Sequence, residues 1–309
     1  MSGASHFSQS YAQARAKFLQ AVEAAGLDAE SHAHPLRGRD AELLAMDVVL
    51  EGAKGARSLL ILSSACHGVE GYCGSGIQIS LLHDAAWHEA VRASGVAVLY
   101  IHALNPYGFS WWRRTTQENV DLNRNFHDFS KPLPKNPRYD ELAHLLVPTV
   151  WPPNADVNAG IAKFMTEHSQ RGFQEAVSGG QYEHPEGLFF GGHNPTWSHV
   201  TLRHVLQEHG KRCADLAWID LHTGLGPNGV AELICACRND DTAALQRARS
   251  WWGKGVTSLA DGTSVSAPLE GLMWQAAYQE CPQARYAGMA MEYGTIPLLD
   301  VMQALRADQ

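Results

Sequence analysis

One short segment of the sequence pairs an imidazole with a carboxylate at a spacing that suits a metal ion. His67 and Glu70 lie three residues apart, just after the apolar run 58–62. In one tight turn both side chains can reach a single Zn²⁺, which takes nitrogen and oxygen ligands at about 2.0–2.2 Å. The pair alone is a weak signal, because a chain of 309 residues with 16 His and 32 acidic residues holds about two such spacings by chance. Its position at the end of a buried strand strengthens it.

Two further strand ends supply the other parts of a hydrolytic site. His222 and Glu292 each follow a buried apolar run, the place where open α/β sheets hold their ligands. A hydrolytic zinc site needs three protein ligands, an open position for water and a general base. The expected ligands are His67, Glu70 and His222, which leaves Glu292 as the base. Asp220 lies two residues before His222, on the same side of its strand, and is placed to hydrogen-bond a ligand imidazole.

The elements that must position these residues alternate between strands and helices or long connections. Strands are expected at 45–50, 58–63, 95–104, 216–221, 233–237 and 288–291, and helices at 7–25, 75–93, 155–177, 196–208, 240–252 and from 297 onward. The proline-rich segment 131–154 is expected to be an extended surface connection. This alternation predicts an α/β fold, a single domain over residues 1–309 with a mixed, mostly parallel central sheet and helices on both faces.

Composition excludes several classes of function. The formal net charge is −8, and the only basic cluster is the pair Arg113 and Arg114, which argues against binding to nucleic acid or to an anionic membrane. No apolar stretch reaches 18 residues, so no membrane span is expected, and residues 1–26 lack a signal-peptide apolar region. The six scattered cysteines fit reduced thiols, either as small buried hydrophobes or, for Cys235 and Cys237, as a metal pair. We expect a cytoplasmic protein and leave its oligomeric state open.

Taken in order along the chain, these motifs resemble the zinc carboxypeptidase superfamily, which includes aspartoacylase and succinylglutamate desuccinylase. The matching segments are His67-x-x-Glu70, Asn105-Pro106-x-Gly108, Trp112-Arg113-Arg114-Thr115, Val120-Asp121-Leu122-Asn123-Arg124-Asn125-Phe126, Asp220-Leu221-His222-Thr223 and Glu292. The segment that begins at Val120 is the most specific of them. More narrowly, the chain resembles an uncharacterised bacterial branch of carboxypeptidase-like proteins, a domain-of-unknown-function family. The resemblance implies a zinc carboxypeptidase-like fold for the whole chain.

The resemblance also implies roles for individual residues. It gives the same zinc ligands and the same general acid/base, namely His67, Glu70, His222 and Glu292. Arg124, with Asn123, would grip a substrate carboxylate. Arg113 would face the developing oxyanion, and Arg114 is its rival because the length of this loop is not fixed by sequence. The substrate-side tyrosine of digestive carboxypeptidases is left unassigned among three candidates, Tyr278, Tyr286 and Tyr293.

We therefore expect a zinc-dependent hydrolase that cleaves an amide bond next to a free carboxylate of a small molecule or short peptide. One Zn²⁺ per chain is expected, with a second metal left open, and Glu292 would take the proton of the attacking water. The alternative is an aspartoacylase-like deacylase of small N-acyl amino acids. A hypothesis from a different class is a non-catalytic metal-dependent binding protein. The retained base favours catalysis, since a binding module needs no proton acceptor beside its metal.

Overall fold

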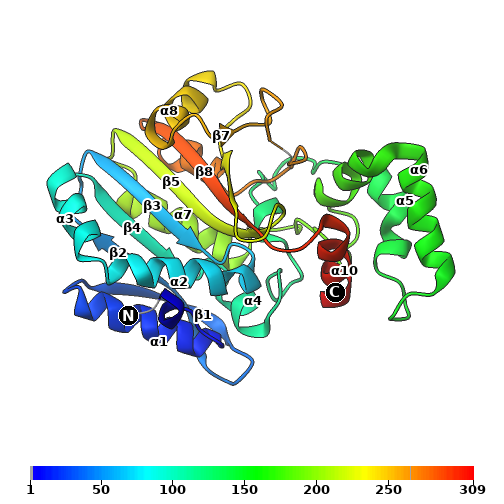
Figure 1. Ribbon diagram of the computed structural model, residues 1–309, viewed down its shortest axis with the longest axis horizontal. Coiled ribbons are helices and arrows are strands. Elements are labelled where there is room, and N and C mark those ends of the chain that lie inside the picture. The colour runs from blue at the N-terminus through cyan, green and yellow to red at the C-terminus, as the bar shows by residue number, and fades with distance from the viewer. Residues whose placement is uncertain (1–2, 265) are drawn as a thin grey trace.

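The computed structural model describes residues 3–264 and 266–309, and its centre is a twisted eight-stranded sheet (Figure 1). The strands are β1 (Ala29–Arg37), β2 (Leu43–Glu51), β3 (Ser58–Ser64), β4 (Ala97–His102), β5 (Asp215–Gly224), β6 (Ala231–Cys235), β7 (Val256–Thr257) and β8 (Arg285–Gly294). Their order across the sheet is β1-β2-β4-β3-β5-β8-β6-β7. Strands β4, β3, β5 and β8 run parallel, whereas β1, β2 and β6 join through antiparallel pairs. The predicted mixed α/β sheet is confirmed.

The helices cover both faces of this sheet. They are α1 (Tyr11–Ala24), α2 (Gly71–Leu82), α3 (Ala85–Ser94), α4 (Pro106–Trp111), α5 (Pro137–Leu146), α6 (Ala155–Ser178), α7 (Trp197–His209), α8 (Thr242–Trp252), α9 (Gln275–Glu280) and α10 (Leu298–Asp308), with short 3-10 turns η1 (Gly3–His6), η2 (Gly68–Glu70) and η3 (Leu122–Arg124). Helices α1, α2 and α3 pack in one apolar cluster with the sheet, and α7, α8 and α9 pack in another. None of the helices in the described ranges is both long and apolar enough to cross a membrane.

The continuous apolar runs of β3 and β4 arise because these central strands are buried on both faces. Successive strand side chains point to opposite faces, so Ile61 joins the cluster under α7 while Leu62 joins the cluster under α1. Leu99 and Tyr100 divide in the same way on β4. A strand with helices on both sides needs apolar residues at every position, which makes such strands easy to find in the sequence.

A helical layer stands beside the sheet and has its own core. Helices α5, α6 and α10 gather at one end of the molecule (Figure 1), around Tyr139, Leu142 and Phe164. The buried guanidinium of Arg306, on α10, donates hydrogen bonds to the carbonyls of Leu145 and Leu146 at the end of α5. The last helix therefore caps α5 and ties the layer together, as a cation near a helix C-terminus can.

Some predicted elements were wrong in extent or kind. The single helix expected at 75–93 is two helices, because the Asp84 side chain accepts hydrogen bonds from two backbone N–H groups and starts α3. The extended connection expected at 131–154 contains helix α5, which begins with Asn136 as its N-cap and Pro137 in its first turn. Edge strand β1 was missed because most of its residues are exposed.

Candidate metal centre

The predicted ligands meet because their strands are neighbours in the sheet. Strand β5 lies between β3 and β8 and runs parallel to both. His222 and Glu292 are register partners across β5 and β8, at the carboxyl ends of their apolar runs. His67 follows the end of β3, where the chain leaves the sheet and turns into η2. Three strand ends therefore place a histidine, an acid and a second histidine at one edge of the sheet.

The turn that carries His67 and Glu70 is held by a close backbone approach. Gly68 accepts no side chain, because a Cβ atom there would lie 2.1 Å from the carbonyl carbon of Gly108. This approach lets the backbone N–H of Gly68 donate to the carbonyl of Arg114 at 3.1 Å, and the N–H of Val69 donate to Arg113 at 3.0 Å. The loop 113–114 therefore fixes the turn that presents the first two ligands.

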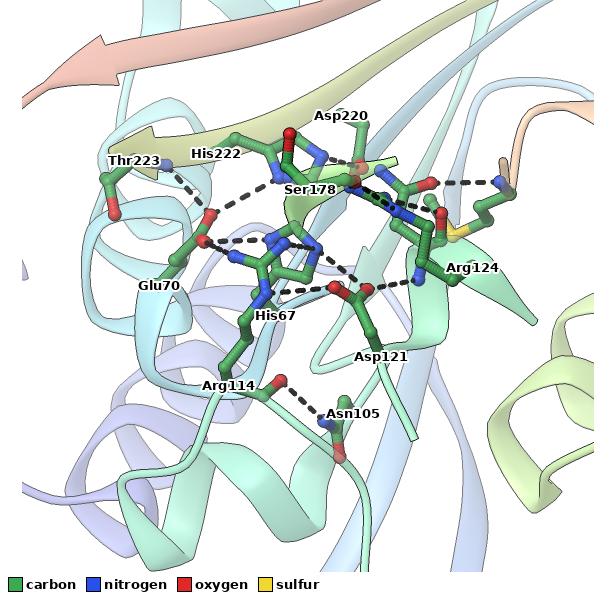
Figure 2. Close-up of polar contacts among 12 residues, drawn as sticks. His67, Glu70, Asn105, Arg114, Asp121, Arg124, Ser178, Asp220, His222 and Thr223 are labelled. Atoms are coloured by element: carbon green, nitrogen blue, oxygen red, sulfur yellow. Dashed lines mark hydrogen bonds and ion pairs between the residues drawn. The ribbon is translucent and has the colours of Figure 1, made fainter. Parts of the chain in front are cut away.

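Glu70 reaches both imidazoles (Figure 2). Its Oε1 lies 2.8 Å from His67 Nδ1, and its Oε2 lies 3.3 Å from His222 Nδ1. One ligand atom from each of these three buried residues lies within 4.8 Å of the other two. Both histidines thus turn Nδ1 toward the carboxylate, and the triad forms one compact set of two nitrogens and one carboxylate.

A carboxylate lies near the far nitrogen of each imidazole. His222 Nε2 is hydrogen-bonded to Asp220, which confirms the geometry predicted from strand alternation. Asp220 in turn accepts a hydrogen bond from Ser63 Oγ. His67 Nε2 lies 3.2 Å from Asp121 Oδ1. Carboxylates in this position orient metal-binding imidazoles and make them more basic, so both candidate ligands are positioned for a cation on Nδ1.

The charged groups of the cluster shift one another's pKa values. Burial alone would raise the pKa of Glu70, but His67 and His222 hold that pKa far below its usual value. Burial would lower the pKa of His222, yet Asp220 and Glu70 raise it well above 6.5. A protonated His222 imidazole and the Arg114 guanidinium thus offset part of the negative charge of these carboxylates. A divalent cation bound to Glu70 and the two imidazoles would add positive charge at the same place, so this donor set fits a metal ion.

Glu292 stands beside the triad. Its Oε1 accepts a hydrogen bond from the backbone N–H of Leu225 at 3.1 Å. Gly224 makes room for it, because a Cβ atom there would lie 2.6 Å from Glu292 Oε1. Burial and the nearby charge of Glu70 raise the pKa of Glu292 above its usual value. A carboxyl group with a raised pKa next to metal ligands is the kind of group that exchanges protons with a substrate.

The arginine that lies in this site is Arg114, whereas Arg113 was expected to face the oxyanion. Arg114 donates to Asp121 Oδ2 at 3.0 Å and to Glu70 Oε1 at 3.4 Å, and its other terminal nitrogen lies 2.7 Å from His67 Nε2. Arg113 instead pairs with Asp308 at 3.2 Å and does not line the cavity. Both backbone carbonyls of this loop accept hydrogen bonds from η2, but only the Arg114 side chain reaches the candidate ligands.

Arg124 and Asn123 lie on the wall of the same cavity. The Nε and NH2 groups of Arg124 donate to the carbonyl of Ser178 at 3.0 and 2.7 Å, and NH1 donates to the carbonyl of Asn123 at 2.8 Å. Three of the five N–H donors of this guanidinium are thus in use, which leaves two. Asn123 Oδ1 accepts from the backbone of Met273, and its amide nitrogen has no partner among the described residues. Together they offer unused donors in a buried setting.

The cavity has a volume of about 760 Å³. It runs from the three candidate ligands along the face of β6 and β8 to α10. Tyr286 lines it, but its hydroxyl donates to the carbonyl of Ala236. The other two candidate tyrosines bond elsewhere, Tyr278 to Asp241 and Tyr293 to Met291. The thiols of Cys235 and Cys237 also line the wall, 2.9 Å apart, and no third metal-ligand side chain joins them among the described residues.

Sequence reasoning favoured a structural role for Asp121, as an acceptor of backbone or arginine hydrogen bonds, and the structure shows both kinds of bond. This carboxylate is fully buried between Arg114 and His67. Burial would raise its pKa, but Arg114, His67 and Arg124 hold that pKa well below its usual value. Its place in the most specific motif, two residues before Asn123, was the available signal. The position alone did not reveal that the side chain reaches back to a ligand imidazole.

Two comparisons of the sequence with known proteins differ in outcome. The profile of a family described as Protein of unknown function (DUF2817) matches residues 7–309. No curated protein matches the chain.

Solved structures share the fold. Thrombin activatable fibrinolysis inhibitor (TAFI) is 12% identical with a TM-score of 0.53, and the match covers 97% of this chain and 75% of that chain. Carboxypeptidase A from Helicoverpa armigera is 11% identical with a TM-score of 0.50, with coverage of 97% and 70%. An aspartoacylase family protein from Mesorhizobium loti is 12% identical with a TM-score of 0.40, with coverage of 91% and 65%. The first two matches show that this chain has the fold of carboxypeptidase A.

Proposed function

This chain belongs to the family described as Protein of unknown function (DUF2817), and on that premise we propose that it is a zinc-dependent hydrolase that cleaves an amide bond next to a free carboxylate. The whole chain would form one catalytic domain over residues 1–309. The observation that carries the proposal is the compact set of His67, Glu70 and His222, with Glu292 as the register partner of one ligand.

The donor set supports zinc. Two imidazole Nδ1 atoms lie against the two oxygens of one carboxylate, and a further carboxylate lies near the far nitrogen of each imidazole. Zinc takes nitrogen and oxygen ligands of this kind, and catalytic zinc sites have three protein ligands. When bound, the ion would polarise the substrate carbonyl and make water more acidic.

Glu292 would move the proton. Its carboxylate would accept a proton from the attacking water and return it to the leaving nitrogen, because amines leave poorly unless they are protonated. The raised pKa of Glu292 suits both halves of this task. Gly224 leaves its carboxylate unobstructed on the ligand side of β8.

Arg114 would stabilise the oxygen that gains charge. Its guanidinium is permanently charged and held by the fully buried Asp121, so the positive charge is in place before the reaction begins. Its contact with Glu70 is long, at 3.4 Å, so this arm of the guanidinium is weakly held. We assign this role to Arg114 rather than Arg113, since Arg113 lies outside the cavity.

Asn123 and Arg124 would bind the substrate carboxylate. The two remaining N–H donors of Arg124 and the free amide of Asn123 match the two oxygens of a carboxylate. The cavity of about 760 Å³ has room for the end of a short peptide as well as for an N-acyl amino acid. Both substrate kinds place a carboxylate beside the cleaved amide, so a carboxypeptidase and a deacylase would use the same residues.

Metal analysis and a substrate screen test this proposal together. Purified protein would be assayed with short peptides, their C-terminal amides and a set of N-acyl amino acids, with Glu292→Gln as the inactive control. Zinc-dependent release of amine from an acid substrate, absent in Glu292→Gln, is expected. Zinc binding without turnover of either substrate kind would instead favour the non-catalytic binding protein.

A further inference from the structure

A second cluster of metal-ligand side chains lies on the edge strand β1, four strands away from His222. Neighbouring strands are about 4.8 Å apart, so the separation across the sheet is roughly 19 Å. Glu30 comes from β1, and Glu208 and His209 come from the end of α7. One ligand atom from each of these three residues lies within 4.8 Å of the other two. The cluster shares no residue with the candidate metal centre.

The imidazole of His209 is buried without hydrogen-bond partners for its ring nitrogens among the described residues. Only 9% of its side chain is exposed. The nearest acid atom is Glu30 Oε2, at 3.9 Å from Nε2, beyond hydrogen-bond distance. A buried polar group without a partner costs about 1–3 kcal/mol, and native proteins keep few of them. Both nitrogens of this imidazole therefore remain to be satisfied.

The surrounding side chains can close on a cation. Glu30 and Glu208 are 47% and 34% exposed, so their carboxylates are free to turn. The partner of Glu208 is Lys54, at 3.4 Å, and Lys54 is exposed and easily displaced. Burial lowers the pKa of His209, which favours the neutral imidazole that binds metals.

His32 offers a second imidazole beside Glu30. Its Nε2 is also buried without a hydrogen bond, and it lies 3.1 Å from Glu30 Oε1. Residues 30 and 32 are two apart on one strand, so their side chains point to the same face, toward α7. Two carboxylates and two imidazoles make a donor set whose negative charge matches a divalent cation.

We propose that Glu30, Glu208 and His209 form a second cation site, with His32 as its fourth ligand. Mixed nitrogen and oxygen donors favour a divalent first-row transition ion such as Zn²⁺ over Mg²⁺ or Ca²⁺, which prefer oxygen alone. Tetrahedral zinc ligands lie about 3.3 Å apart, so the ligand atoms of Glu30, Glu208 and His209, now within 4.8 Å of one another, have to approach by at most about 1.5 Å. The ion joins the edge strand β1 to the end of α7.

Zinc stoichiometry tests this site apart from the catalytic proposal. In His67→Ala/His222→Ala, which removes the candidate centre, one Zn²⁺ per chain is expected by equilibrium dialysis with elemental analysis, and added Zn²⁺ is expected to raise the Tm. Adding Glu30→Gln, a change at an exposed position, should weaken Zn²⁺ binding at least tenfold. Adding His209→Ala should abolish it. The control His144→Ala replaces an exposed histidine on α5 and should change neither result.

Two results would overturn the proposal. One is a His67→Ala/His222→Ala variant that binds no Zn²⁺, which leaves the catalytic proposal intact. The other is Zn²⁺ binding in that background that survives both Glu30→Gln and His209→Ala. Glu30→Gln decides the question even if His209→Ala fails to fold. Conversely, a wild type whose zinc is removed entirely by Glu30→Gln would place the metal here and count against the catalytic proposal.

Discussion

His222 and Glu292 lie opposite each other in register on the parallel strands β5 and β8. Backbone hydrogen bonds of the central sheet, rather than loop conformation, therefore set the spacing between a candidate ligand and the candidate base. Paired positions on adjacent strands are about 4.8 Å apart and face the same side. The same register brings Glu292 near Glu70, which contacts His222 and whose charge raises the pKa of Glu292.

Loss of one imidazole should empty the centre without unfolding the protein. In His67→Ala we expect the loss of one Zn²⁺ per chain and of most activity, because a catalytic zinc site has only three protein ligands and two would remain. The fold should persist, since the ligands are attached to a buried eight-stranded sheet. Elemental analysis and thermal unfolding measure the two effects. Full occupancy of the centre in His67→Ala/His222→Ala would show that the ligands lie elsewhere.

Glu292→Gln should separate proton transfer from metal binding. The amide keeps the size of the side chain but accepts no proton, so kcat should fall by at least about 100-fold. Zinc content should match the wild type, because Glu292 is not among the three ligands. Steady-state kinetics with elemental analysis checks both. An unchanged kcat would move the base role to another carboxylate.

Arg114 and Arg113 form a matched pair for testing the oxyanion role. Arg114→Ala should lower kcat by about 100-fold or more, as expected when a charged donor at the reacting oxygen is lost. Arg113→Ala removes a half-exposed pair with Asp308 and should change kcat by less than a few-fold. Circular dichroism would confirm that both variants fold. Equal losses in the two variants would mean that the loop, rather than one guanidinium, matters.

Arg124→Ala should remove the preference for a free carboxylate. Truncating one partner of a buried charge pair costs about 2–5 kcal/mol, or roughly 30- to 4,000-fold in kcat/KM. The wild type should cleave an acid substrate far faster than its C-terminal amide, whereas the variant should treat them alike. Zinc content serves as the control. A wild type that cleaves acid and amide equally well would point to an endopeptidase or esterase instead.

Stability should fall in mild acid because of a buried histidine away from the site. Burial lowers the pKa of His102 to about 4, from an ordinary value of 6.5. The His102 side chain takes up a proton below pH 6.5 in the unfolded chain, but only near pH 4 in the folded chain. The contribution of His102 to the free energy of unfolding is therefore full above pH 6.5 and is lost as the pH falls to 4. The free energy of unfolding is expected to fall by about 3 kcal/mol at most.

Denaturant unfolding between pH 4 and 7, with chelator present, measures this effect. His102→Gln should reduce the slope of the unfolding free energy against pH. His199, whose pKa burial likewise lowers to about 4, should account for part of the slope that remains. A slope that is the same in wild type and His102→Gln would show that His102 is not the group responsible.

The positions of the candidate site residues were predictable from sequence where those residues lie on strands. Strand β5 is a buried run that ends in a polar residue, so His222 could be placed at its end, and strand alternation correctly turned Asp220 toward the imidazole of His222. These inferences need only the period of a strand and the rule that ligands gather at strand ends.

The features that could not be predicted from sequence depend on contacts between distant segments of the chain. The choice between Arg113 and Arg114 follows from how the loop lies on η2 and α10, which no local pattern encodes. Helix α5 was hidden by the prolines around it, although Asn136 before Pro137 is a helix start signal. The Glu30–His209 cluster joins residues far apart in the chain on an exposed strand that sequence reasoning missed, so nothing in their spacing could bring them together.

Strand β1 also determines how this sheet ends. Its outer side faces no other strand among the described residues, and an open edge invites another chain to add a strand. Pro35 has no N–H to offer an added strand, and the register shift between Ala33 and Arg37 interrupts straight pairing. The opposite edge, β7, is only two residues long. Both edges are thus poor templates for strand addition, which guards concentrated protein against polymerising through its sheets.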